Sequence, residues 1–340
     1  IFYFLSIINK INGLKFDLHY SLLFLISPFF ISSILSLEPI SIVWTVIYAS
    51  NCILIYDLIK NNFKSTIQSF RIFSFILVIL LFLQLFIYGV DFISGRYVGN
   101  FRPVDFASVS LIACFLGIFS SKKNYELIFY IFSFFILTIS VISRASIFTG
   151  ILFLLIYFFL YMYYQNKFEM IYRLIIAFIV IFIPFYIIFF EQINPSIELL
   201  FTFLDLTDSE RGFGSGFTGR LDKYLLSFEV FKQRPLFGMG YGLYDESHSG
   251  ILQLLIELGL YGFFVFIIFL LNIFYGYHLY LKQVFSKKVI ASISFIITFQ
   301  FLAIFERQLI NFGHIAGLII LFNLLFAIIV VDKYNLKIDE

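Results

Sequence analysis

The chain has 340 residues, of which 61% are hydrophobic and only 13% are charged, and its formal net charge is +2. About a quarter of the residues in a soluble globular domain are charged, so this composition excludes such a domain. Apolar runs long enough to cross a bilayer as helices recur along the chain, whereas a membrane β-barrel would show short alternating segments. The small net charge gives no indication of nucleic-acid binding.

The hydropathy pattern predicts eleven membrane-spanning helices, counting a remnant at the start of the chain. The predicted spans are residues 1–9, 19–37, 40–59, 71–90, 104–120, 125–143, 146–164, 172–190, 249–279, 289–305 and 312–331. We therefore expect an all-α, polytopic fold. It divides into N-terminal transmembrane helices (1–190), a large loop (191–248), C-terminal transmembrane helices (249–331) and a tail (332–340).

The start of the chain limits what can be said about the number of spans. The chain opens on Ile1 without an initiator Met, so we expect a truncated N-terminus and treat eleven spans as a minimum.

The cysteines, Cys52 and Cys114, lie in separate apolar segments without Cys-x-x-Cys or Cys/His spacing. We interpret them as packing residues and predict no metal site and no cofactor.

Lysine and arginine are distributed unequally between the two sets of connections. One set has twelve Lys and two Arg: Lys10, Lys15, Lys60, Lys64, Arg71, Lys122, Lys123, Lys167, Arg173, Lys282, Lys287, Lys288, Lys333 and Lys337. The other has seven Arg and two Lys: Arg96, Arg102, Arg144, Arg211, Arg220, Lys223, Lys232, Arg234 and Arg307. The richer set is expected to be cytoplasmic, which places the loop 191–248 outside. Because Arg binds phosphate bidentately, the Arg bias predicts a phosphate or carboxylate ligand outside; chance is the alternative.

The loop 191–248 is too long for an ordinary connection, so it is either functional or disordered. Its Gly-rich stretch, 207–219, precedes a segment, 220–234, with apolar residues at helical spacing. These residues are Leu221, Tyr224, Leu225, Phe228 and Phe231. We predict a short amphipathic helix at the membrane surface, capped by Thr218 or Gly219 and stopped by Pro235.

Three residues of the outer face are candidates for chemistry. Arg220 opposes the dipole of the predicted helix, and a bound anion would offset this cost; an exposed Arg without a ligand is the alternative. Arg144 joins two spans next to lipid, where it either binds an anionic group or snorkels. His248, where the loop re-enters the membrane, has either a structural role or that of a base. Glu257 would lie on the opposite face of a regular helix from His248 unless that helix breaks, for example near Gly250.

The same segments occur in one order along the chain. They are SRAS at 143–146, GR at 219–220, RPLFGMG at 234–240, and HSGIL followed by ELGLYG between 248 and 262. This ordered block, roughly residues 140–275, resembles the conserved block of the O-antigen polymerase and O-antigen ligase family (Wzy-type proteins). Elsewhere the chain matches that family only in hydropathy.

The resemblance implies a GT-C-like, metal-independent glycosyltransferase. Its substrate would be an oligosaccharide repeat on undecaprenyl pyrophosphate, at the outer leaflet of the bacterial cytoplasmic membrane. Arg144 and Arg220 match the family's essential arginines and His248 its histidine, whereas Ser249 replaces the usual Asn. Further substrate-binding candidates are Arg96, Arg102, Arg211, Arg234, Glu257 and Arg307. Expected partners are membrane lipids, a chain-length regulator and a flippase.

Three functions stay open at this point. We favour a polymerase over a ligase that moves the finished chain to the lipid A core, because Phe- and Ile-rich chains of this kind resemble polymerases more often. A lipid-linked oligosaccharide flippase or another transporter would favour internal repeats and charged or broken helices near the middle of the membrane. The charges here lie mostly at the ends of the predicted spans.

Overall fold

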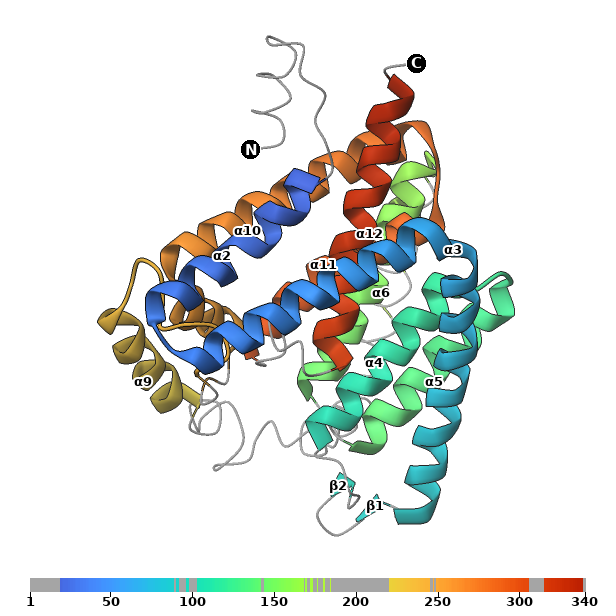
Figure 1. Cartoon of the computed structure of the whole chain (residues 1–340). Coiled ribbons are helices and arrows are strands. Elements are labelled where there is room, and N and C mark those ends of the chain that lie inside the picture. Colours follow the sequence, from blue (N-terminus) through green and yellow to red (C-terminus); the bar gives the residue numbers. More distant parts are fainter. Residues whose placement is uncertain are drawn as a thin grey trace.

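The computed structural model describes residues 19–88, 90–91, 96–97, 103–141, 144–167, 220–244, 247, 249–305 and 315–338, with single positions at 169, 172, 173, 176, 180 and 184. The helices in these ranges are α2 (His19–Ser36), α3 (Pro39–Tyr88), α4 (Pro103–Ser120), α5 (Asn124–Val141), α6 (Arg144–Tyr164), α9 (Arg220–Gln233), α10 (Gly250–Gln283), α11 (Lys287–Phe305) and α12 (Ile315–Ile338) (Figure 1). Two short strands, β1 (Val90–Asp91) and β2 (Arg96–Tyr97), pair antiparallel. The all-α class is confirmed.

Four of these helices are long and apolar enough to cross a membrane: α3, α6 from Ser146, α10 and α11 to Ile304. Shorter apolar helices lie within α2, α4, α5 and α12. Only 17% of the most apolar window of α3 is buried inside the protein. An apolar helix with so much of its surface facing outward is stable in lipid and not in water, so the chain has the character of a membrane protein. The predicted span 1–9 and most of 172–190 lie outside the described residues.

Two predicted spans, 40–59 and 71–90, are parts of one helix. α3 runs through both and departs from helical geometry at Asn62, where φ is −127° and ψ is 31°. Its first half crosses the face of the molecule and its second half runs down beside α4 (Figure 1). The intervening residues carry Lys, Asn, Ser and Thr, a composition that predicts a surface connection, whereas the structure has a bend within one helix.

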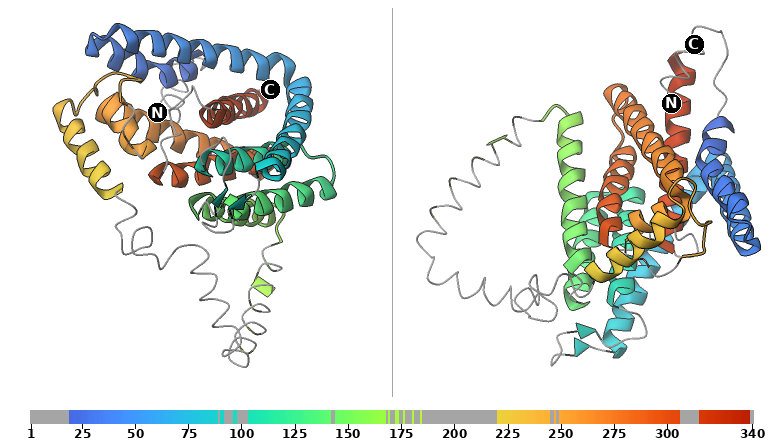
Figure 2. Two further views of the ribbon diagram at one scale, coloured as in Figure 1. Left: turned by 90° about the horizontal axis from the view of Figure 1, so that it is seen from below. Right: turned by 90° about the vertical axis from the view of Figure 1, so that its left-hand side faces the viewer.

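The helices form a bundle whose connections collect at two ends. α2 packs along α10, α4 lies against both α3 and α5, and α11 packs against α6. Aromatic pairs fill the interior, for example Phe115 stacked on Phe295 with ring centroids 4.0 Å apart. Figures 1 and 2 place α9, the start of α10 and the β1–β2 hairpin toward one end, which we call the α9 end. The bend of α3 and the connections 121–123 and 284–286 lie at the opposite end, which we call the lysine end.

Three buried polar side chains tie the C-terminal helices together. The Tyr277 and Ser292 hydroxyls lie 3.0 Å apart, and the Ser292 hydroxyl donates to Asn323 Oδ1 at 2.9 Å. All three residues are completely buried and come from α10, α11 and α12. In lipid, where burying apolar surface gives helices little reason to associate, such interhelical hydrogen bonds contribute to specific packing.

We expect Asn323→Leu to lower the free energy of unfolding by about 1 kcal/mol, because it removes the acceptor of the Ser292 hydroxyl. The measurement is thermal unfolding of the purified protein in detergent. Asn272→Leu is the matched control, because the Asn272 amide donates only within its own helix, to the Ile268 carbonyl at 2.7 Å. Equal losses of stability in the two variants would contradict a stabilising role of the hydrogen bond between Ser292 and Asn323.

Candidate functional site

α10 is broken two residues after Glu257. Gly259 has φ 67° and ψ −172°, a conformation that is essentially restricted to glycine. The predicted single span 249–279 matches the extent of α10, but a break near Gly250 is not observed. Gly250 is the first residue of the helix, and Ser249 is its N-cap. Glu257 therefore belongs to a short first segment of α10, about 10 Å from its start along the axis.

The segment 234–242, between α9 and α10, binds the backbone at this break. Because the helix is interrupted, backbone groups between 256 and 261 would lack partners. Four hydrogen bonds supply them: Met239 N to Ile256 O (2.8 Å), Gly240 N to Glu257 O (3.2 Å), Leu260 N to Pro235 O (2.8 Å) and Tyr261 N to Leu236 O (3.0 Å). The RPLFGMG motif thus supplies the hydrogen-bond partners that the interrupted helix lacks, and these bonds hold the segment 234–242 against α10.

The approach of the two backbones explains the glycines on both sides. Gly238 has φ 76°, and a Cβ there would lie 2.3 Å from the Glu257 carbonyl oxygen. A Cβ at Gly259 would lie 2.4 Å from the Leu236 carbonyl oxygen. Neither distance is sterically possible without movement of the backbone, so both positions require glycine.

Glu257 is completely buried and belongs to a polar cluster under the segment 234–244. Gln253 Nε2 donates to Glu257 Oε1 at 3.1 Å and to the Tyr244 carbonyl at 3.4 Å. The Ser32 hydroxyl of α2 donates to the Glu257 carbonyl. With its amide nitrogen held this way, Gln253 leaves its buried Oε1 without a hydrogen-bond partner in the described part of the chain. An ionisable residue at membrane depth is a functional candidate by default.

The residues on both sides of His248 are fixed at the α9 end. The Ser247 hydroxyl donates to the Ser249 carbonyl at 2.7 Å, and both serines are buried. The Ser249 hydroxyl accepts from Leu252 N at 3.4 Å and donates to the Ala303 carbonyl of α11 at 3.2 Å. Ser249, which stands where the resembling family has Asn, therefore caps α10 and fastens it to α11.

α9 confirms the predicted helix 220–234 to within one residue. Leu225 and Phe228 are exposed, at 59% and 47%, as expected for the apolar face of a helix at a membrane surface. On the inner side, the Tyr224 hydroxyl donates to the Ile304 carbonyl at 3.0 Å, and the Ser227 hydroxyl lies 3.3 Å from that of Tyr244. α9 therefore lies beside α10 and reaches the end of α11 (Figure 2).

The other candidates fall into two groups. Arg144 is the first residue of α6, Arg220 is the first residue of α9, and Arg96 lies in β2, but their side chains are not among those described. Arg234 follows α9, is exposed, and its carbonyl accepts from Gly238 N at 3.0 Å. The candidates and caps outside the described residues are Arg102, Arg211, Thr218, Gly219, His248 and Arg307.

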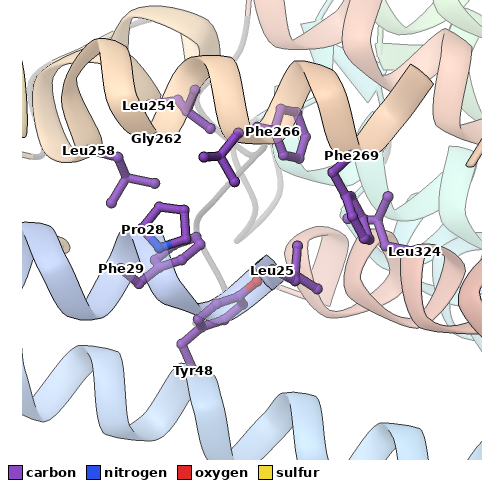
Figure 3. Close-up of a pocket in the computed structure, with 11 residues that line it drawn as sticks. Leu25, Pro28, Phe29, Tyr48, Leu254, Leu258, Gly262, Phe266, Phe269 and Leu324 are labelled. Atoms are coloured by element: carbon purple, nitrogen blue, oxygen red, sulfur yellow. The ribbon is translucent and has the colours of Figure 1, made fainter. Parts of the chain in front are cut away.

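An apolar groove adjoins the polar cluster (Figure 3). α2, α3, α10 and α12 form it, and Leu254 and Leu258 line it one residue away from Gln253 and Glu257. Its aromatic lining residues Phe29 and Tyr48 contact Tyr241 of the segment 234–242, with ring centroids 4.9 and 6.0 Å away. The groove is small, about 20 Å³, and it places hydrocarbon side chains next to the polar groups of Gln253 and Glu257.

Sequence reasoning missed Gln253, Ser32 and the break at Gly259. The length of the predicted span carried a signal, since 249–279 is longer than the roughly 20 residues that cross a bilayer, and ELGLYG supplies the glycines.

Cys52 and Cys114 are buried free thiols, in agreement with their interpretation as packing residues. No cluster of three His, Cys, Asp or Glu side chains occurs in the described ranges.

We expect Gly259→Ala to release the segment 234–242 and to destabilise the protein by about 2 kcal/mol, because the new methyl group meets the Leu236 carbonyl and the backbone conformation disfavours alanine. The measurement is the rate of chymotryptic cleavage after the buried Tyr241 in the variant relative to wild type. Gly276→Ala is the control, because its methyl group meets Val331 at the other end of α10. Continued protection of Tyr241 in Gly259→Ala would contradict the anchoring.

Comparison of the chain with protein-family models, with curated proteins and with solved structures gave no match.

Proposed function

We propose that this protein is a polymerase of surface polysaccharide that joins oligosaccharide repeats carried on undecaprenyl pyrophosphate. The observation that carries the proposal is the polar cluster of Gln253 and Glu257 beside an apolar groove, at the end of the bundle that holds the family-like motifs. A lipid-linked saccharide has matching parts, polar groups for the cluster and an isoprenoid chain for the apolar side chains beside it.

The proposal assigns chemical roles to three residues. The acceptor sugar's hydroxyl oxygen attacks the anomeric carbon of the donor, the bond from that carbon to the pyrophosphate oxygen breaks, and undecaprenyl pyrophosphate leaves. His248 takes the proton of the attacking hydroxyl. Arg144 and Arg220 stabilise the negative charge that develops on the leaving pyrophosphate. The product is a longer lipid-linked chain.

Several local features support these roles. α9 begins at Arg220, and the N–H groups in the first turn of a helix can bind an anion. The serines on both sides of His248 in the sequence are buried, and Ser249 is bound to α11. Within this proposal the fold is GT-C-like with eleven or more spans. The α9 end then faces outward from a bacterial cytoplasmic membrane.

Two other functions use the same features. A ligase that transfers the finished chain to lipid A core would need the same lipid-pyrophosphate donor. A lipid-linked oligosaccharide transporter is favoured by the break in α10 next to the buried Glu257, because transporters place broken helices and buried charges at their substrate sites. The three functions differ in what accumulates when the protein is absent.

The decisive test is the gel profile of surface polysaccharide from a strain that lacks the gene, complemented with wild type or with His248→Ala. A polymerase predicts core with a single repeat in the null strain and a ladder restored by wild type only. Bare core with accumulated lipid-linked polymer would identify the ligase instead. An unchanged ladder would exclude both and favour transport. His278→Ala is the matched control, because His278 contacts Tyr164 at the opposite end of the bundle.

We further expect Arg144→Lys and Arg220→Lys each to lose most of the polymerising activity, because a lysine point charge cannot reproduce the bidentate contact of a guanidinium with phosphate. The measurement is chain extension of the lipid-linked repeat by membranes with matched protein levels. Arg173→Lys is the control, since Arg173 forms only an exposed pair with Glu169, at 2.6 Å. Full activity of both variants would rule out the pyrophosphate role.

A further inference from the structure

The lysine end of the bundle gathers cations from two places, the start of α11 and the connection between α4 and α5. Lys288 at the start of α11 lies over the ring of Phe63, at the bend of α3, with its ammonium 5.5 Å from the centroid. Lys122 lies in the connection that follows α4, α4 packs against α11, and the charge of Lys122 acts on that of Lys288. Lys287 lies 5.8 Å from the Tyr161 ring centroid, at the end of α6.

The nearby carboxylates do not neutralise Lys122 and Lys288. Glu126 forms an ion pair with Arg71, and its second oxygen accepts from the backbone N–H of Lys122 at 3.0 Å. Asp57 accepts from the Asn61 amide at 2.6 Å. Within the described ranges, neither lysine ammonium pairs with a carboxylate. Glu126 therefore fixes the backbone of Lys122, while the Lys122 ammonium has no carboxylate partner among the described residues.

The start of α11 adds to the positive potential at this place. Its first turn holds two lysines and no acidic residue, so both cations oppose the helix dipole. The Ser286 hydroxyl accepts from Val289 N at 3.5 Å and so satisfies one of the four free N–H groups of the first turn. An anion at this position would offset both the dipole and the repulsion between Lys122 and Lys288.

We propose that this cluster binds the phosphate headgroup of an anionic phospholipid in the leaflet at the lysine end. A phospholipid fits better than free phosphate because α3, which carries Phe63, exposes apolar side chains before and after its bend, where acyl chains would lie. Leu58 and Ile72, on the two sides of the bend, are 47% and 55% exposed. Phe63 is partly buried and stacks on Phe326, which provides a firm base below Lys288. This inference does not depend on the proposed polymerase activity.

The test is a titration of delipidated protein in neutral detergent with phosphatidylglycerol or phosphatidylcholine, followed by the shift of the melting temperature. Wild type is expected to be stabilised more by phosphatidylglycerol, and less so as NaCl concentration rises. The double variant Lys122→Gln/Lys288→Gln is expected to bind phosphatidylglycerol about 30-fold more weakly, at about 5-fold per lysine. The control Lys223→Gln/Lys232→Gln removes two charges from α9 at the other end and is expected to bind like wild type.

Each outcome decides the proposal. Retained phosphatidylglycerol binding in the lysine-end double variant, or an equal loss in the α9 control, would overturn it. Equal stabilisation of wild type by both lipids would do the same. Competition by millimolar inorganic phosphate would indicate a site for the free anion and would also contradict a lipid site. If the Gln variant fails to fold, Lys122→Arg/Lys288→Arg, which keeps both charges, and the salt dependence of wild type still separate these outcomes.

Discussion

The hydrogen bonds between the segment 234–242 and the broken backbone of α10 determine the architecture of the α9 end. In lipid, an unpaired backbone group costs several kcal/mol, so a helix can be interrupted only where protein supplies new partners. The break at Gly259 is compensated in this way by four bonds from a segment of the preceding loop. The same bonds fix where the loop leaves α9 and where it turns back into α10. The placement of α9, of the serines around His248 and of Glu257 therefore follows from one backbone pairing.

The sequence predicted the bounds of several helices closely, but α12 continues to Ile338, beyond the predicted span 312–331 and into the predicted tail. The predicted spans 19–37, 104–120, 125–143 and 289–305 agree with α2, α4, α5 and α11 to within about two residues at each end, which is the usual uncertainty of helix boundaries. α3 was predicted as two spans because residues 60–70 are polar enough for a surface connection, but the helix continues through them with a bend at Asn62. Hydropathy distinguishes segments that lie in lipid from segments that lie in water, but it does not distinguish a bent helix from a loop at the membrane surface.

The residues of the candidate site could be predicted one by one, but the contacts between them could not. Gly259, Glu257 and the RPLFGMG motif were all visible, but pairing them needs the contact between a loop and a helix that lie about twenty residues apart. Gln253 gave no signal, since a single amide in an apolar run is unremarkable until its two partners are known. The interpretation of Glu257 and His248 as lying on opposite faces assumed that one regular helix carries both. α10 instead begins at Gly250, after His248.

Glu257 makes hydrogen bonds through its backbone carbonyl and through its side-chain carboxylate, and these two groups have different partners. Its carbonyl oxygen accepts from Gly240 N and from the Ser32 hydroxyl, bonds that any residue at this position would keep. Its carboxylate receives the amide of Gln253, which also holds the Tyr244 carbonyl four residues before His248. The fold thus needs the backbone of Glu257, whereas the side chain links the helix to the segment before the proposed base.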